Sequence, residues 1–417
     1  MSGSDVFIRD LTGTGKTLGL VLAALGKAYS SETAHLQTLI LVPTRDLALQ
    51  VTAWIRSLQP HVQPQHMSSV VQCLVSGVDM QVQSELLKNV PKMVVGTPVR
   101  TLELFESGVL DVSRLQLLVM DEVDRLVKVP TRYTTVKEKF KANVHPPAGQ
   151  ILLDKIVQKR HASKDKALKE ADQDLEKKKR LQVVVCSATL NHAIKRFFMQ
   201  REWIGKDPAL VDTTGKLQAP DTLTHYAYAV TPEGLYSLDW SREPEEVDTT
   251  QATKEETMDN TLSDWDNTFS DTDRPVLDSM VHLIHSHSIP SGFIFAHASV
   301  SIRKLVEDCQ ALGLDAGRLM DVTDYTHESI QGSEKRQVPK WIVLTEHEAR
   351  GLDLPLANHV FILGVPSSPA SYLHMSGRAG RAGRQGKVMT LLGGHKFSLR
   401  FGKMMKLLNI SHASLEA

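Results

Sequence analysis

The sequence predicts an α/β protein with two domains, each a mainly parallel sheet flanked by helices. Short, fully apolar runs recur along the chain, and each run leads directly into polar residues. Runs of this kind are typical of strands that are buried on both faces, as in parallel sheets covered by helices. The length of 417 residues favours two or three domains, and the runs fall into two groups.

The first group of apolar runs predicts the sheet of the N-terminal domain. Amphipathic segments such as Arg45–Leu58 and Asn191–Met199 alternate with the runs, so the predicted order is βαβα. Ligands of such sheets bind beyond the carboxyl ends of the strands, which is where the polar residues fall. The predicted strands are Val6–Ile8, Leu39–Val42, Met93–Val95, Leu117–Met120 and Val183–Val185.

The second group of runs follows a junction near Thr213–Asp221 and predicts a second sheet. We therefore place the N-terminal domain at residues 1–216 and the C-terminal domain at residues 217–417. The predicted strands are His225–Val230, Gly292–Phe295, Trp341–Leu344 and Val360–Leu363.

The charges balance, with 48 Lys and Arg against 48 Asp and Glu, so any surface that binds nucleic acid must be a local patch. Two segments depart from this balance. Lys155–Arg180 carries ten bases and five acids, within an insertion at about 130–180 that we expect to form a projecting hairpin or helix. Arg242–Arg274 carries eleven acids and three bases and predicts a disordered insertion. We interpret both as solvated surface and not as catalytic segments.

The three cysteines, Cys73, Cys186 and Cys309, lie far apart, which argues against a zinc site or a disulfide framework and fits a reducing compartment. No apolar run approaches the roughly 18 residues of a membrane span, and the N-terminus has no signal-peptide pattern. We expect an intracellular, soluble protein without a membrane partner. Its compartment stays open among nuclear or nucleolar, cytoplasmic and mitochondrial.

A Gly-rich loop follows the first predicted strand, in the stretch "DLTGTGKT". Its glycines allow backbone N–H groups to surround phosphate oxygens at the start of a helix near Leu18. Lys16 would reach the β- and γ-phosphates, and the Thr17 hydroxyl would join a Mg²⁺ shell. Asp10 stands where a small neutral residue is expected, either repelling the triphosphate or accepting local backbone hydrogen bonds. The loop comprises Thr12, Gly13, Thr14, Gly15, Lys16 and Thr17.

An acidic pair follows the strand Leu117–Met120. Asp121 can hold Mg²⁺ through water, and Glu122 can orient and deprotonate an attacking water. Acids at a strand end also cap helices, so the pair alone is weak evidence for a catalytic site. Its position downstream of the phosphate loop and upstream of the "SAT" stretch makes the catalytic interpretation stronger.

An arginine motif in the second domain reads "YLHMSGRAGRAGR". Arg378 and Arg381, separated by glycine, suit contact with a γ-phosphate across an interdomain cleft. The same run, taken alone, equally fits a flexible basic loop that binds any polyanion.

In this order and spacing the motifs resemble the DEAD-box family of ATP-dependent RNA helicases over nearly the whole chain. The resemblance implies two RecA-like domains that close on ATP and RNA and build the active site between them, with ATP and Mg²⁺ as cofactors. It implies that RNA is the partner and that the protein contacts the RNA sugar-phosphate backbone with little sequence preference. It also implies ribonucleoprotein or ribosome-assembly partners. The matching stretches are "TGTGKT", "PTRDLA", "TPVR", "DEVD", "SAT", "FIFAH", "ARGLD" and "HMSGRAGR".

The resemblance also implies roles for individual residues. Glu122, Asp121 and Lys16 would act in hydrolysis, with Arg378 and Arg381 as arginine fingers. Thr17 would bind Mg²⁺ directly and Asp121 through water. Nucleotide contacts would come from Thr12, Gly13, Thr14, Gly15, Lys16, Thr17 and, on the ribose side, Asp353. Coupling to domain closure would involve Asp124, Ser187 and Thr189. The RNA backbone would contact Pro43, Thr44, Arg45, Gly77, Thr97, Arg100 and Thr345.

Several departures from the family concern RNA handling and domain coupling. Only eleven residues precede Thr12, and none matches the adenine-reading motif, which leaves a truncated chain or weak adenine selectivity as alternatives. The region between His297 and Trp341 lacks the expected strand-loop signature. Because the hydrolytic residues are intact, we favour an RNA-dependent ATPase over the alternative, a degenerate helicase that binds RNA or ribonucleoprotein as a scaffold. The substituted positions are Asp10, Ser76, Val99, Val123 and Met375.

Overall fold

The computed structural model divides into two compact units, Met1–Gly215 and Lys216–Ala417, and each is described by itself. The structure describes residues 3–10, 15–29, 35–129, 140, 144–169, 181–188, 190–213, 222–240, 274–318, 339–346, 348, 357–380, 384–393, 396–411 and 413, apart from the side chains of 160–169 and 396–399. The acidic insertion lies outside these residues except for Arg274, as do residues 170–180 of the basic one.

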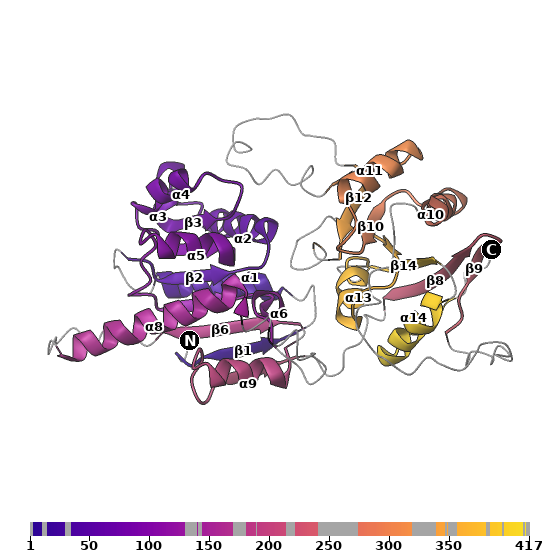
Figure 1. Cartoon of the computed structure of the whole chain (residues 1–417). Coiled ribbons are helices and arrows are strands. Elements are labelled where there is room, and N and C mark those ends of the chain that lie inside the picture. Colours follow the sequence, from indigo (N-terminus) through magenta and orange to yellow (C-terminus); the bar gives the residue numbers. More distant parts are fainter. Residues whose placement is uncertain are drawn as a thin grey trace. The chain divides into compact units, whose positions relative to one another are not determined.

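Unit 1 contains a seven-stranded sheet in the order β3-β4-β2-β5-β6-β1-β7, and every strand pair in it is parallel (Figure 1). The five predicted strands are present. Two further strands, β3 and β7, were not predicted, because the run of β3 contains Gln72 and all four residues of β7 are exposed. The strands are β1 (Val6–Arg9), β2 (Thr38–Leu41), β3 (Val71–Leu74), β4 (Met93–Gly96), β5 (Leu117–Met120), β6 (Gln182–Ser187) and β7 (Ala209–Asp212).

The helices of unit 1 flank this sheet, so the central strands are buried on both faces. Helix α8 lies within the predicted basic insertion and extends past the end of the sheet (Figure 1). Its Asp154 accepts a hydrogen bond from Trp203 Nε1 at 2.7 Å, which ties the helix to the core. The helices are α1 (Lys16–Ala28), α2 (Arg45–Ser57), α3 (Met67–Val70), α4 (Met80–Leu87), α5 (Pro98–Glu106), α6 (Val123–Leu126), α8 (Ala148–Lys169) and α9 (His192–Gln200), with a 3₁₀ turn at Pro64–His66.

Unit 2 contains a second seven-stranded sheet, in the order β11-β12-β10-β13-β14-β8-β9. Its strands are parallel except for the antiparallel pair β8 and β9. The region between His297 and Trp341, whose sequence lacks the family's strand-loop signature, contains the short strand β11; its three residues, Ala-Gly-Arg, offer no apolar run to detect. The strands are β8 (Leu223–Thr231), β9 (Gly234–Ser237), β10 (Gly292–Ala296), β11 (Ala316–Arg318), β12 (Trp341–Thr345), β13 (His359–Leu363) and β14 (Gly386–Gly393).

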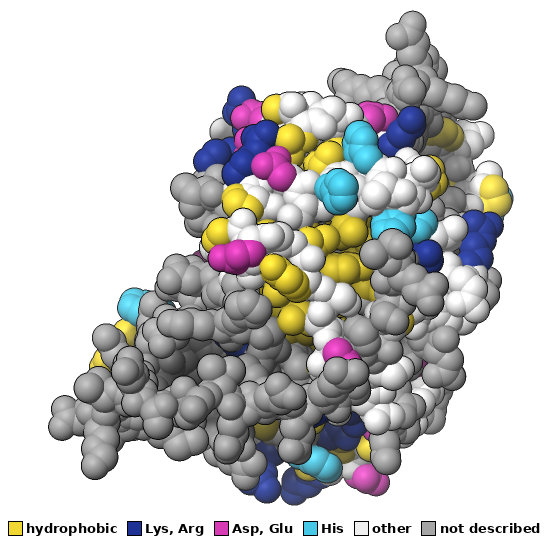
Figure 2. Space-filling model, turned by 90° about the vertical axis from the view of Figure 1, so that its right-hand side faces the viewer, with side chains coloured by type: hydrophobic (Ala, Val, Ile, Leu, Met, Phe, Trp, Pro, Cys, Tyr) yellow, Lys and Arg dark blue, Asp and Glu magenta, His cyan; other side chains and the backbone are white. Residues whose placement is uncertain are grey.

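The helices of unit 2 are α10 (Arg274–Ser286), α11 (Ile302–Ala311), α13 (Pro369–Ser376) and α14 (Lys396–Leu407). Helix α13 begins with Ser368 as its N-cap, whose hydroxyl accepts the Ser371 N–H, and with Pro369 in its first turn. It leads directly into the arginine motif. On the face shown in Figure 2, Lys and Arg side chains form separate groups and not one continuous basic field.

A buried cluster holds α13 against the sheet of unit 2. Tyr372 of α13 and His225 of β8 share a hydrogen bond of 2.6 Å between Oη and Nδ1. Burial lowers the pKa of His225 to about 4 and raises the pKa of Tyr372, so both are neutral. Tyr372 also packs edge-on against Phe401, which packs against Trp240. These contacts fix the orientation of α13.

Candidate nucleotide and RNA site

The end of the Gly-rich loop lies at the N-terminus of α1. Gly15 is its N-cap, with φ 84° and ψ 14°, a left-handed conformation that favours glycine. Lys16 and Thr17 form the first turn, and the N-terminus of a helix favours an anion through its backbone N–H groups and its dipole. Thr12, Gly13 and Thr14 lie outside the described residues, so their part in the loop stays a prediction.

Tertiary structure brings Thr17 together with Asp121, 104 residues away. The Thr17 hydroxyl donates to Asp121 Oδ2 at 2.6 Å. Asp121 is 1% exposed at the end of β5, and its backbone N–H donates to the carbonyl of Leu41 in the neighbouring strand. Burial raises the pKa of Asp121, while the Thr17 hydrogen bond and the Lys16 charge oppose that shift. A hydroxyl and a carboxylate side by side are hard oxygen donors, which is what Mg²⁺ prefers.

Glu122 follows in a left-handed conformation, with φ 50° and ψ 50°, and is 3% exposed. Its backbone N–H donates to Asp121 Oδ1 at 2.9 Å, which helps to fix the Asp121 carboxylate at the strand end. Such a conformation is uncommon for a residue with a side chain and is often found at functional sites.

The end of β6 contacts the short helix α6. Ser187 Oγ donates to Asp124 Oδ1 at 2.7 Å, which connects the "SAT" stretch to the acidic motif. Thr189 lies outside the described residues. The role of these residues in coupling stays a prediction.

Sequence reasoning did not assign Cys186 to the site, although it immediately precedes Ser187. Burial first, and then the charge of Asp121, raise the pKa of its thiol. The thiol therefore stays protonated beside Asp121. Its place at the end of an apolar strand run was the available signal.

A groove of about 400 Å³ in unit 1 contains three of the predicted RNA residues, Pro43, Arg45 and Thr97. Val99 also lines it and is 53% exposed. Sequence reasoning missed Arg125, Leu126 and residues 147–149 of the lining, because they belong to no recognised motif. The other lining residues are Ser76, Pro98, Arg125, Leu126, Pro147, Ala148 and Gly149.

The remaining predicted RNA residues of unit 1 stabilise the loops beside this groove. Arg45 Nη1 donates to the carbonyl of Ser76 at 3.2 Å, and Arg100 Nη1 donates to that of Val78 at 2.8 Å. Gly77 between them has φ +83°, and a Cβ there would collide with the Arg45 guanidinium. Thr44 caps α2 by accepting the N–H of Leu47 at 3.4 Å.

In unit 2 the arginine motif begins at the end of α13. Arg378 is 2% exposed, and its N–H donates to the carbonyl of Met375. Met375 is 1% exposed, so this substituted side chain packs inside the unit. Arg381 and Asp353 lie outside the described residues.

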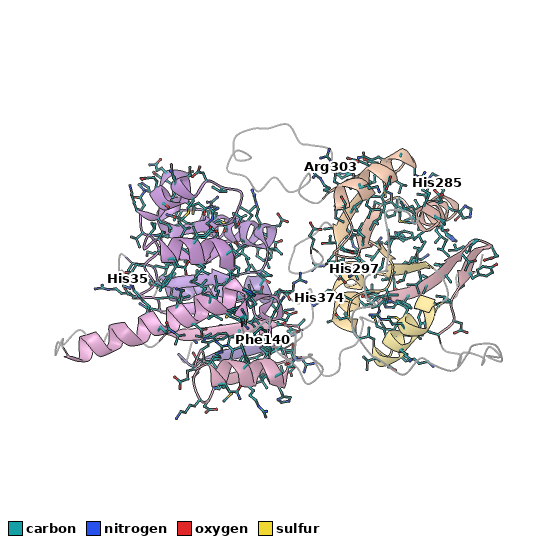
Figure 3. The ribbon with its side chains drawn as sticks, in the orientation of Figure 1. His35, Phe140, His285, His297, Arg303 and His374 are labelled. Atoms are coloured by element: carbon teal, nitrogen blue, oxygen red, sulfur yellow. The ribbon has the colours of Figure 1, made fainter. Side chains whose placement is uncertain are left out.

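Thr345 ends β12, and its two donors are engaged by one carboxylate. Its N–H and its hydroxyl donate to Glu348 Oε2 at 2.7 and 2.9 Å. The next residue, Glu346, is 2% exposed, and its Oε1 lies 3.7 Å from Nε2 of His297, which Figure 3 labels on the loop after β10. His374, labelled on α13, is 2% exposed.

Two kinds of feature are absent from the described residues. No described helix is long and apolar enough to cross a membrane. Within the described ranges, no three His, Cys, Asp or Glu side chains gather as a metal cluster. A Mg²⁺ site with one carboxylate, a hydroxyl and ligand phosphates needs no such cluster.

Comparisons with known proteins connect these features. Residues 1–197 match the model described as DEAD/DEAH box helicase, and residues 276–383 match the helicase conserved C-terminal domain. The chain is 27% identical over 388 residues to the DEAD-box ATP-dependent RNA helicase 47, mitochondrial, of Arabidopsis thaliana, covering 90% of this chain and 63% of that protein. It is 24% identical over 402 residues to the ATP-dependent RNA helicase DHH1 of Vanderwaltozyma polyspora, covering 94% and 63%. The chain thus spans less than two thirds of the length of these relatives.

Solved structures show the same fold at low identity. S. cerevisiae Dbp5 bound to RNA and ADP BeF3 has a TM-score of 0.63 at 17% identity, covering 98% of this chain and 85% of that one. DEAD-box helicase Mss116 bound to ssRNA and UDP-BeF has a TM-score of 0.64 at 19% identity, covering 100% and 71%. The fold is that of two RecA-like domains, as the sequence predicted.

Proposed function

This chain belongs to the DEAD/DEAH box helicase family, and on that premise we propose that it is an RNA-dependent ATPase and RNA helicase. It would separate short duplexes or remodel ribonucleoprotein through ATP-driven closure of its two units. The observation that carries the proposal is the contact of the Thr17 hydroxyl with Asp121, beside Lys16 and Glu122, at the helix terminus that suits an anion. Both relatives and Mss116 are helicases by their descriptions, and the Dbp5 structure is described as bound to RNA and ADP BeF3.

ATP with Mg²⁺ is the proposed cofactor. Thr17 and Asp121 fit the ion, because their oxygens lie 2.6 Å apart and within reach of one ligand sphere. The bound ion would neutralise charge on the triphosphate. Lys16 would hold the β- and γ-phosphates together with the N–H groups that follow Gly15. Buried Glu122 would orient the attacking water and accept its proton.

RNA is the proposed partner of the groove in unit 1. Arg45 and Thr97 line it with a cation and a hydroxyl, which suit phosphate contacts and read no base. Little sequence preference follows. Target choice would then rest with ribonucleoprotein or ribosome-assembly partners.

Closure is the proposed source of the remaining catalytic groups. Arg378 and Arg381 would reach the γ-phosphate as arginine fingers, and Asp353 would contact the ribose. Arginine fingers typically contribute about 10³ to 10⁵ in rate. Replacing either arginine by alanine should abolish RNA-stimulated turnover in the full chain, and retained turnover would contradict the two-unit active site.

The alternative proposal is a scaffold that binds RNA and hydrolyses ATP slowly or never. The observation in its favour is Met375, a buried apolar side chain at a position where the family organises its interface with arginine. The intact contact of Thr17 with Asp121 favours the enzyme instead.

The ATPase rate, measured with and without single-stranded RNA, distinguishes the RNA-dependent ATPase from the scaffold. We expect stimulation of the wild-type chain. Glu122→Gln should keep ATP and RNA binding and lose turnover, because the amide preserves shape but cannot take the proton. Thr213→Ser, at an exposed position in unit 1, serves as the matched control and should behave as wild type. A wild-type rate that RNA does not change would support the scaffold.

A further inference from the structure

The carboxyl end of β12 contains a closed ring of hydrogen bonds between Thr345 and Glu348. Thr345 donates its N–H and its hydroxyl to Glu348 Oε2, at 2.7 and 2.9 Å. In return, the Glu348 N–H donates to Thr345 Oγ1 at 3.2 Å. This is the reciprocal pattern of a capping box, in which a Thr and a Glu three residues later satisfy each other.

The ring places an anion on the donors of Thr345. A backbone N–H and a hydroxyl that converge on one negatively charged oxygen form the same arrangement that binds a phosphate oxygen. Glu348 Oε2 therefore occupies the position that an RNA phosphate would need at Thr345. A phosphate can use these donors only after the carboxylate has left.

The neighbouring carboxylate does not take part in this ring. Glu346 Oε2 accepts the Ser367 N–H at 3.1 Å, and its Oε1 lies 3.7 Å from His297 Nε2. Glu346 is 2% exposed, whereas Glu348 is partly exposed. Glu348 is thus the carboxylate that can turn away into solvent when a competing anion arrives.

We propose that Glu348 is an internal competitor of the RNA backbone at Thr345, which lowers the affinity of unit 2 for RNA until a phosphate displaces it. This inference rests on the proposed function, because it takes RNA as the partner. The displacement breaks two hydrogen bonds to a carboxylate and forms two equivalent ones to a phosphodiester. The free-energy change of this exchange is therefore close to zero, and the negative charge of Glu348 determines its sign.

The test uses Glu348→Gln in the full chain. Glutamine keeps the side-chain oxygen that a capping box requires but removes the negative charge. Loss of one like charge near the phosphate should tighten binding of a fluorescent single-stranded oligouridylate by about threefold to tenfold at low salt. Binding would be followed by fluorescence anisotropy with a non-hydrolysable ATP analogue present.

Glu307→Gln is the matched control, because it makes the same change in net charge at an exposed residue of α11. It should leave RNA affinity unchanged. In a double-mutant cycle with Thr345→Ala, the gain from Glu348→Gln should disappear, because the donors that Glu348 blocks are then incomplete.

The outcomes are separable. The competitor role is overturned if Glu348→Gln binds RNA no more tightly than the wild type, or if Glu307→Gln shows the same gain in affinity. In either case, RNA binding by the wild type leaves the proposed function in place. A gain that persists in the Thr345→Ala background also overturns it. If neither the wild type nor the variants bind RNA, the proposed function and this inference fail together.

Discussion

Lowering the pH below about 6.5, the ordinary pKa of histidine, should destabilise unit 2 through His225. Its imidazole is 4% exposed and shares a hydrogen bond with the Tyr372 hydroxyl at Nδ1, so protonation would put a charge in the core. Burial lowers the pKa of His225 from 6.5 to about 4. Between these two pKa values, His225 is therefore protonated in the unfolded chain but neutral in the native state.

The sign and size follow from proton linkage. Above pH 6.5 both states are neutral at His225, and its full contribution to stability is present. Between pH 6.5 and about pH 4 the unfolded state binds more protons, so the free energy of unfolding falls as the pH falls. With about 1.4 kcal/mol per pKa unit, the loss from pH 7.5 to 4.5 is about 2.5 kcal/mol.

The assay is denaturant unfolding of the full chain at both pH values, followed by the fluorescence of its tryptophans. His225→Gln removes the titration while its side-chain amide, which both donates and accepts, can still hydrogen-bond to the Tyr372 hydroxyl. We expect this variant to lose about 2.5 kcal/mol less than wild type on acidification. His285→Gln, at an exposed position on α10 labelled in Figure 3, should follow the wild type. Parallel losses in wild type and His225→Gln would refute the reasoning.

Three other changes test unit 1. Asp5→Ala should lower the free energy of unfolding by about 2–4 kcal/mol, because two backbone N–H groups that donate to the buried carboxylate at 2.7 and 2.8 Å would lose their acceptor. Denaturant unfolding measures this loss, and a near-neutral effect would contradict the prediction. Gly149→Ala should destabilise unit 1 by about 1–3 kcal/mol and weaken RNA binding, since the new Cβ would collide with the carbonyl oxygen of Leu126 beside the groove. An unchanged melting temperature and an unchanged RNA affinity would contradict this close contact between Gly149 and Leu126. Asp10→Ala should tighten ATP binding roughly tenfold in calorimetry if the carboxylate repels the triphosphate, and an unchanged dissociation constant would assign Asp10 to local hydrogen bonding.

Local patterns carried much of the fold and the outline of the site. The apolar run Leu39–Val42 predicted β2 because a strand buried on both faces needs no polar alternation. The amphipathic period of Arg45–Leu58 predicted α2 to within one residue, and the Gly-rich loop predicted a helix starting at Leu18, two residues after α1 begins at Lys16. These signals reside in neighbouring residues, so the sequence alone expresses them.

Other features depend on contacts between distant segments. The three residues of β11 form a strand because β12 supplies its hydrogen-bond partners, and their own pattern carries no apolar run. Arg45 was predicted from its motif as an RNA contact, but only the folded chain shows that it also holds the Ser76 carbonyl.

The division between sequence and tertiary structure is clearest at the carboxyl ends of the strands in the two sheets. The Gly-rich loop predicted Thr17, the acidic pair at a strand end predicted Asp121, and the family resemblance implied Thr345 as a site residue. Only the tertiary structure decided that Thr17 lies 2.6 Å from Asp121 and that Glu348 engages both donors of Thr345. Side-chain hydrogen bonds depend on rotamers and distances set by packing, which no local pattern in the chain encodes.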